Sequence, residues 1–124
     1  MPVTDSFVEF VLEQLDSLGP LTPKRMFGGV GLYAGDLFFA LVADDVVYLK
    51  ADDSTRGALE AAGARPFQPY PDRPRGGGTM QYYSVPAAIL EDRDELTTWA
   101  IRSVAIARAQ RAAPPKRGKN KRSG

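Results

Sequence analysis

The fold is decided by residues 25–33, which read RMFGGVGLY, an apolar run punctuated by glycines. A Gly35-Asp36 pair follows, and then a second apolar run. Gly29-x-Gly31-x-x-Ala34 matches the letters of a dinucleotide-binding fingerprint, but that fingerprint needs a helix directly behind its glycines. No helical pattern follows here, so the glycines predict a bulged or sharply bent strand pair and no phosphate-binding loop.

Residues 25–33 are predicted to form the first of three strands, and the other two cover residues 37–43 and 46–50. Gly35-Asp36 and Asp44-Asp45 supply short turns between the strands, because small polar side chains bond the local backbone. Parallel strands would need longer crossovers. Residues 25–50 are therefore predicted to form an antiparallel meander.

Helices are predicted before and after this meander in the sequence. Residues 6–18 carry apolar side chains at helical spacing, with Ser6 and Glu9 placed as a capping box and Gly19-Pro20 as a stop. Asp52-Asp53-Ser54 opens a second helix, over residues 53–62, and Gly63 closes it. The adjacent carboxylates of Asp52 and Asp53 are interpreted as helix-capping groups rather than a catalytic pair.

The remaining sequence predicts two more strands and a long helix. The weaker strand covers residues 65–70, and the stronger one covers residues 79–85. After a short turn over residues 86–90, the last helix begins near Asp92 and runs to about residue 111. The predicted order α-β-β-β-α-β-β-α is typical of an α+β fold in which helices pack on an antiparallel sheet.

The irregular segment over residues 64–78 interleaves basic and aromatic side chains. Such a pattern can bind single-stranded nucleic acid by stacking and phosphate contact. The alternative, a solvated loop with its aromatic rings packed on the domain, is favoured. The residues concerned are Arg65, Phe67, Tyr70, Arg73 and Arg75.

Composition narrows the chemistry available. The 124 residues include no cysteine and no histidine, which excludes thiolate catalysis, disulfides and the commonest metal ligand and general base. No metal or cofactor site is predicted. No segment has the length of a bilayer span or the pattern of a signal peptide, so a cytoplasmic protein is expected.

Charge divides the chain into two parts. Residues 1–112 hold 11 Lys and Arg against 15 Asp and Glu, a net charge of −4, and are predicted to form a single domain. Residues 113–124 carry five positive charges and no acid, and are predicted to be a disordered basic tail. The candidate nucleic-acid contacts in this tail are Lys116, Arg117, Lys119, Lys121 and Arg122.

Five motifs in order give the chain a family resemblance over about residues 6–108. The chain resembles the TfoX (Sxy) N-terminal domain family, whose members include bacterial regulators of competence for DNA uptake. The motifs are Lys24-Arg25-Met26-Phe27-Gly28-Gly29-Val30-Gly31-Leu32-Tyr33, Phe39-Ala40-Leu41-Val42, Tyr48-Leu49-Lys50-Ala51-Asp52, Tyr82-Tyr83-Ser84-Val85-Pro86 and Leu96-Thr97-Thr98-Trp99-Ala100.

The resemblance implies an α-β(3)-α-β(2)-α fold of the secretion-chaperone-like kind. It also implies a role in gene regulation rather than catalysis, and it supplies no catalytic residue. Longer members of the family have a second, C-terminal domain, where this chain has its basic tail. The resemblance points to one interaction surface, formed by Arg25, Phe27, Gly28, Gly29 and Gly31.

Three functions remain open at this point. The first is a small non-catalytic regulatory or protein-interaction module that contacts its partner through a sheet face or edge and pairs as a homodimer. The second is a weak, sequence-independent nucleic-acid binder that uses the tail. The third is an enzyme without histidine or cysteine, in which Lys50 and the Tyr82-Tyr83 pair would perform proton chemistry.

Overall fold

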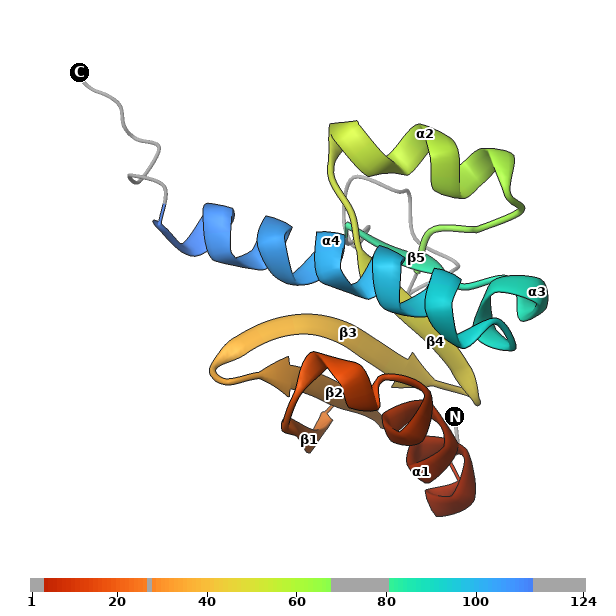
Figure 1. Ribbon diagram of the computed structural model, residues 1–124, viewed down its shortest axis with the longest axis vertical. Helices are drawn as coiled ribbons and strands as arrows, with labels where there is room; N and C mark the ends of the chain where they lie inside the picture. The colour runs from red at the N-terminus through yellow and green to blue at the C-terminus, as the bar shows by residue number, and fades with distance from the viewer. Residues whose placement is uncertain (1–3, 27, 68–80, 113–124) are drawn as a thin grey trace.

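A five-stranded antiparallel sheet, with its strands in the order β1-β2-β3-β4-β5, is the framework of the protein (Figure 1). The computed structural model describes residues 4–26, 28–67 and 81–112. The strands are β1 (Leu21–Met26), β2 (Gly29–Ala34), β3 (Leu37–Ala43), β4 (Val46–Lys50) and β5 (Tyr82–Ser84). The helices are α1 (Asp5–Gln14), the short 3-10 helix η1 (Asp16–Leu18), α2 (Asp53–Ala61), α3 (Ala87–Leu90) and α4 (Arg93–Ala112).

The α+β class, the strands over residues 37–43 and 46–50 and the antiparallel meander are confirmed. The prediction of one strand over residues 25–33 is wrong, because the segment is a hairpin of β1 and β2. Gly28 lies between the two strands with a φ of 75°, a left-handed conformation that glycine adopts without strain. Pro23 is tolerated in β1 because β1 is an edge strand.

Among the described residues after α2, less of the chain lies in the sheet than predicted. β5 spans only Tyr82–Ser84, and Thr79 and Met80 lie outside the described residues. Of the strand predicted over residues 65–70, the described part forms an isolated bridge between Pro66 and Tyr83. The backbone N–H of Phe67 donates to the carbonyl of Tyr82 at 2.8 Å, so this segment lies along the outer edge of β5.

The predicted close approach and bulge are both present in the pairing of β2 with β3. A Cβ atom on Gly29 would lie 2.4 Å from the carbonyl oxygen of Val42, well inside contact distance. The register then shifts between Leu32 and Tyr33, which is a bulge. Glycine at position 29 therefore allows β2 to lie close against β3.

The first helix begins earlier than the capping box predicted. Thr4, rather than Ser6, is the N-cap, and its hydroxyl accepts from the N–H of Phe7 at 3.3 Å. The N–H of Thr4 donates to the carboxylate of Asp45 at 3.0 Å, which ties the helix start to the β3–β4 turn. This long-range hydrogen bond holds Thr4 in place as the N-cap, so the helix begins at Asp5, before Ser6.

The long helix α4 lies against the sheet, and α2 lies on its other side (Figure 1). Residues of β2, β3 and β4 pack with α1 and α4 to form the main core, and the bulge lets both Phe39 and Ala40 belong to it. Trp99 of α4 packs against both this core and a smaller cluster beneath α2. The main core consists of Val11, Leu15, Val30, Leu32, Phe39, Ala40, Val42, Val47, Leu49, Val85, Ile89, Leu96, Ala100 and Ala107.

We expect Gly29→Ala to lower the free energy of unfolding by about 1–3 kcal/mol, because the new methyl group overlaps the Val42 carbonyl oxygen. Gly57→Ala in α2 is the matched control. Its Cβ would meet nothing within 4 Å, and alanine in a helix should add about 0.5–1 kcal/mol. Urea titrations of the two variants give the comparison. Equal midpoints would contradict the close approach of β2 to β3.

Candidate functional site

The structure separates the members of the predicted interaction surface. Arg25 and Gly28 are exposed at the end of the β1–β2 hairpin, whereas Gly29 and Gly31 are buried. Phe27 lies outside the described residues. Arg25 forms a 3.4 Å ion pair with Asp5, and both side chains are largely exposed, so this pair adds little to stability. The surface around Arg25 and Gly28 stays a prediction.

The edge of the sheet at β1 is poorly suited to receive another strand. Residues 22–25 are all exposed. Pro23 lacks a backbone donor, and Lys24 and Arg25 place charges along the edge. These are devices by which sheet proteins prevent edge-to-edge pairing. A partner is therefore better accommodated by a face of the sheet than by this edge.

The sheet face directed away from α4 carries a group of aromatic rings, here called the aromatic face. Tyr33 stacks on Phe38 with ring centroids 5.2 Å apart, and Phe38 lies 5.3 Å from Tyr82. Tyr48 meets Phe67 edge-on at 4.9 Å. Leu41, which belongs to neither helix-side cluster, is fully buried on the same face opposite Tyr48.

Sequence reasoning missed the aromatic face. Tyr33 and Tyr48 follow the period-two alternation of their strands, and that signal was available. The bulge in the β2–β3 pairing hides the place of Phe38, since it changes which residues share a face. Phe67 and Tyr82 come from other parts of the chain, and only the fold brings them to this surface.

Lys50 and Tyr82, two residues of the enzyme hypothesis, are in contact on this face. The Lys50 ammonium lies 3.4 Å from the Tyr82 hydroxyl and 5.0 Å from its ring centroid. Burial lowers the pKa of Lys50. Burial, with a smaller contribution from Tyr33, raises the pKa of Tyr82. Tyr83 faces the opposite side of the sheet, in the cluster beneath α2.

The polar atoms of Lys50 and Tyr82 are engaged in hydrogen bonds with other groups of the fold. The Tyr82 hydroxyl donates to the carbonyl of Phe38 at 3.4 Å, and the Lys50 carbonyl accepts from the Ser103 hydroxyl at 2.8 Å. A hollow of about 290 Å³ borders Lys50. Its lining consists of Asp36, Leu37, Phe38, Lys50, Ala107 and Gln110.

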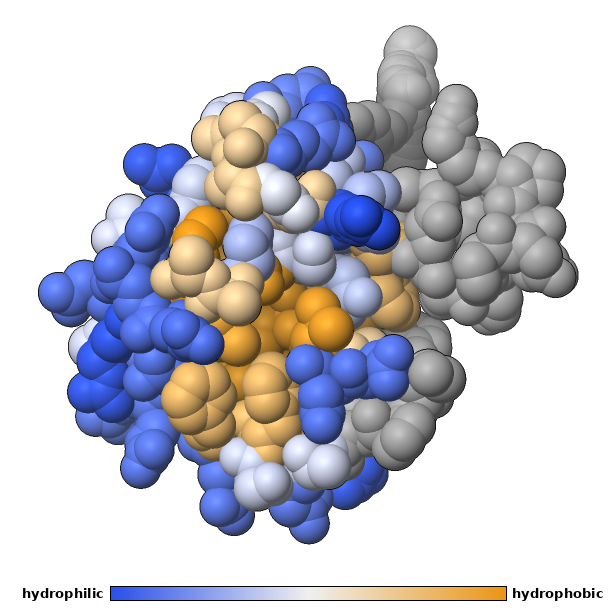
Figure 2. Space-filling view, turned by 90° about the vertical axis from the view of Figure 1, so that its right-hand side faces the viewer, coloured by the Kyte–Doolittle hydropathy of each residue, from blue (hydrophilic) through white to orange (hydrophobic). Residues whose placement is uncertain are grey.

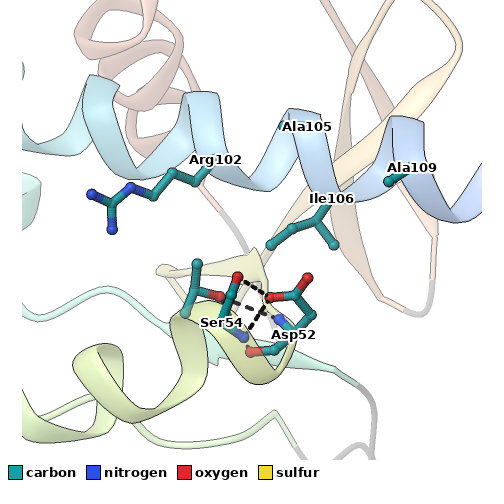
Figure 3. A pocket seen from close by; sticks show the side chains of 7 residues that line it. Asp52, Ser54, Arg102, Ala105, Ile106 and Ala109 are labelled. Carbon is teal, nitrogen blue, oxygen red and sulfur yellow. Dashed lines mark hydrogen bonds between the residues drawn. The ribbon is translucent and has the colours of Figure 1, made fainter.

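A larger groove, of about 450 Å³, lies between the start of α2 and the second half of α4 (Figure 3). Asp52 and Ser54 point into it from below α4 in this view, and the two are joined by hydrogen bonds. The Ser54 hydroxyl donates to Asp52 at 2.6 Å, and this bond is the largest cause of a lowered pKa for the Asp52 carboxyl. Asp52 caps α2, as predicted. The lining is Asp52, Ser54, Thr55, Arg102, Ala105, Ile106 and Ala109.

An apolar patch surrounded by polar side chains lies on the side of the molecule formed by α1 and α3 (Figure 2). Phe10 of α1 is 38% exposed, and its ring lies 6.3 Å from that of Phe7. Leu90 of α3 is partly buried against the core. Apolar side chains of both α1 and α3 thus pack against the main core.

Residues 13–107 match the TfoX N-terminal domain, which is most of the chain. The chain belongs to the TfoX N-terminal domain family. The match runs from α1 into α4 and contains the β1–β2 hairpin and every residue of the aromatic face. A search of curated proteins finds no match.

Two structural findings describe this TfoX N-terminal domain further. The described parts of the chain contain no group of three or more acidic, histidine or cysteine side chains placed to hold a metal ion. Within residues 4–26, 28–67 and 81–112, no helix has the length and apolar character required to cross a membrane.

The buried Tyr82 hydroxyl should make this domain sensitive to alkali. Above about pH 10 the unfolded chain releases the tyrosine proton while folded Tyr82 retains it, so the free energy of unfolding falls as the pH rises. Tyr82→Phe removes this contribution. It should cost about 1 kcal/mol or less at neutral pH, since both hydroxyl contacts are long.

Urea midpoints measured at neutral pH and at about pH 11 test this expectation. The wild type should lose more stability between the two conditions than Tyr82→Phe. Lys50 is common to both proteins, so its own titration is present in both measurements. Parallel losses in the two proteins would contradict the burial of the Tyr82 hydroxyl.

Proposed function

We propose that this TfoX N-terminal domain is a non-catalytic cytoplasmic module that regulates gene expression by binding a protein partner, and that it self-associates as a homodimer. The observation that carries the proposal is the aromatic face. Aromatic side chains are enriched at protein interfaces and supply a large share of binding energy there. Regulation of competence or of transcription is the role that family membership favours.

The chemistry of the aromatic face supports a protein ligand. Tyr33 and Phe38 are half-buried, so their rings have area left to cover, while their stacking fixes their orientation. The Lys24 ammonium lies 4.8 Å from the Tyr33 ring centroid and adds a positive rim. Rigid rings of this kind bind with little loss of side-chain entropy.

A non-catalytic role is supported by how the reactive groups are engaged. Lys50 and Tyr82 contact each other, and Tyr82 also contacts a backbone carbonyl. Asp52 serves as a helix cap. Groups committed to such contacts stabilise the fold, and the two hollows beside them are broad and open rather than deep.

The proposed partner binding can be tested by affinity purification of the tagged full-length chain from its source cell after nuclease treatment. Tyr33→Ala should release a protein that the wild type retains, because it removes a half-buried ring of the aromatic face that stacks on Phe38. Phe10→Ala, which truncates an exposed aromatic residue on α1, is the matched control and should retain it.

The proposal also expects that deleting the gene changes transcript levels, and that the Phe10→Ala protein restores them while Tyr33→Ala does not. Loss of the partner from both variants, or restoration by both, would contradict a role for the aromatic face.

The charge distribution favours a second candidate, weak nucleic-acid binding through the tail. Arg102 and Arg108 are exposed on α4, which leads directly into the five basic residues of residues 113–124. The contacts proposed from the sequence, Lys116, Arg117, Lys119, Lys121 and Arg122, lie outside the described residues. Opposing them is the net negative charge of residues 1–112.

Neutralising about five phosphates would make log K fall with log salt at a slope near −4.5. Titration of the full chain with duplex DNA at several salt concentrations should give this slope, and a chain ending at residue 112 should lose most of the binding. Equal binding by the intact and shortened chains would eliminate the tail as the contact.

A further inference from the structure

The exposed side of α4 carries a regular pattern of side chains that is separate from the aromatic face. Five exposed positions follow one another at spacings of four, three, four and three residues, which places them along one side of a helix. We call this line the α4 stripe. It consists of Asp94, Thr98, Ile101, Ala105 and Arg108.

The α4 stripe has an apolar centre. Ile101 is 53% exposed, more than any other large apolar side chain among the described residues. Thr98 and Ala105 flank it with small side chains, and the Thr98 hydroxyl is turned back to the carbonyl of Asp94 at 3.1 Å. Small flanking residues let another helix approach closely around the isoleucine.

The two ends of the stripe carry opposite charges. Asp94 and Arg108 are each seven residues from Ile101, or about 10.5 Å along the helix axis. An identical helix running in the opposite direction would place the Asp94 of each copy opposite the Arg108 of the other. A parallel arrangement would instead set like charges against each other.

We propose that the α4 stripe is the dimer interface of this protein, with a second copy of the chain as its occupant. The two α4 helices pair antiparallel about a two-fold axis beside Ile101, so that the isoleucines meet and two Asp94–Arg108 pairs close the ends. This inference rests on the self-association given under the proposed function and locates its contact. It leaves the aromatic face of both copies free for a different partner.

Self-complementarity is the argument for a second copy over another partner. A two-fold contact brings each surface against itself, so a patch suited to it must carry its own complementary charges. The acidic start and basic end of α4 meet that requirement. The α2–α4 groove adjoins the stripe through Arg102, Ala105 and Ala109 and widens the surface that the partner helix can cover.

The first test is the mass of the full chain by sedimentation equilibrium at micromolar concentrations. The wild type should have twice the chain mass of 13.5 kDa. Ile101→Lys should weaken dimerisation at least ten-fold, because it places two ammonium groups together on the axis. Phe10→Lys, an equally drastic change at an exposed apolar residue on α1, should leave the dimer unchanged.

The second test is a charge exchange. Asp94→Arg alone and Arg108→Asp alone each put like charges opposite one another and should each weaken dimerisation several-fold. The double variant recreates opposite pairs and should recover most of the wild-type association. A merely structural effect of either substitution would not be rescued, and urea midpoints report whether each variant is folded.

The outcomes separate the inference from the proposed function. If Ile101→Lys still dimerises and the charge-exchange variants associate as the wild type does, the α4 interface is wrong, although self-association stands. A wild-type monomer at all concentrations would overturn both. Partner capture through Tyr33 is measured independently of either result.

Discussion

The burial of β3 on both of its faces is the constraint on which the rest of the structure depends. Phe39, Ala40, Leu41 and Val42 are all fully buried. Ala40 and Val42 face α4, while Leu41 lies on the opposite side of the sheet. Burial of both faces requires that the neighbouring strands lie close to β3. Because Gly29 of β2 has no side chain, the β2 backbone can lie against the Val42 carbonyl oxygen. Glycine in this segment thus serves strand packing and not phosphate binding.

This central strand divides the molecule into two sides with different tasks. On one side, α4 covers β3 and β4, and Trp99 links the main core with the cluster beneath α2. Because that side is filled by tightly packed, buried side chains, it stabilises the fold. On the other side, the half-buried rings of Tyr33, Phe38, Tyr48 and Phe67 leave area that a ligand can cover. The proposed function belongs to the second side for that reason.

Short-range sequence patterns predicted the turns and helix caps, whose structure depends on neighbouring residues. Asp44 and Asp45 form the turn between β3 and β4 with φ values of 54° and 55°, a conformation that aspartate tolerates better than most residues. Asp52 caps α2 as its sequence context indicated. The β1–β2 hairpin was missed because Pro23 and two basic residues obscure an edge strand that pairs with β2 alone. The aromatic face was missed because its two groups of rings, Tyr33–Phe38–Tyr82 and Tyr48–Phe67, form through the pairing of segments that are separate in the sequence.

The proposed α4 dimer determines how far apart the two basic tails would lie, and this separation affects the proposed binding of nucleic acid. Ala112 lies eleven residues from Ile101, so in an antiparallel pair the two tails would leave the dimer about 33 Å apart along the helix axis. That separation is several times the screening length of about 8 Å at physiological salt. The tails would therefore act as independent cationic segments, and a short duplex would contact one tail at a time. A salt slope near −4.5 is then expected for short DNA whether the protein is a monomer or a dimer. A steeper slope would appear only on DNA long enough to reach both tails, so the dependence of the slope on DNA length reports the geometry of the dimer.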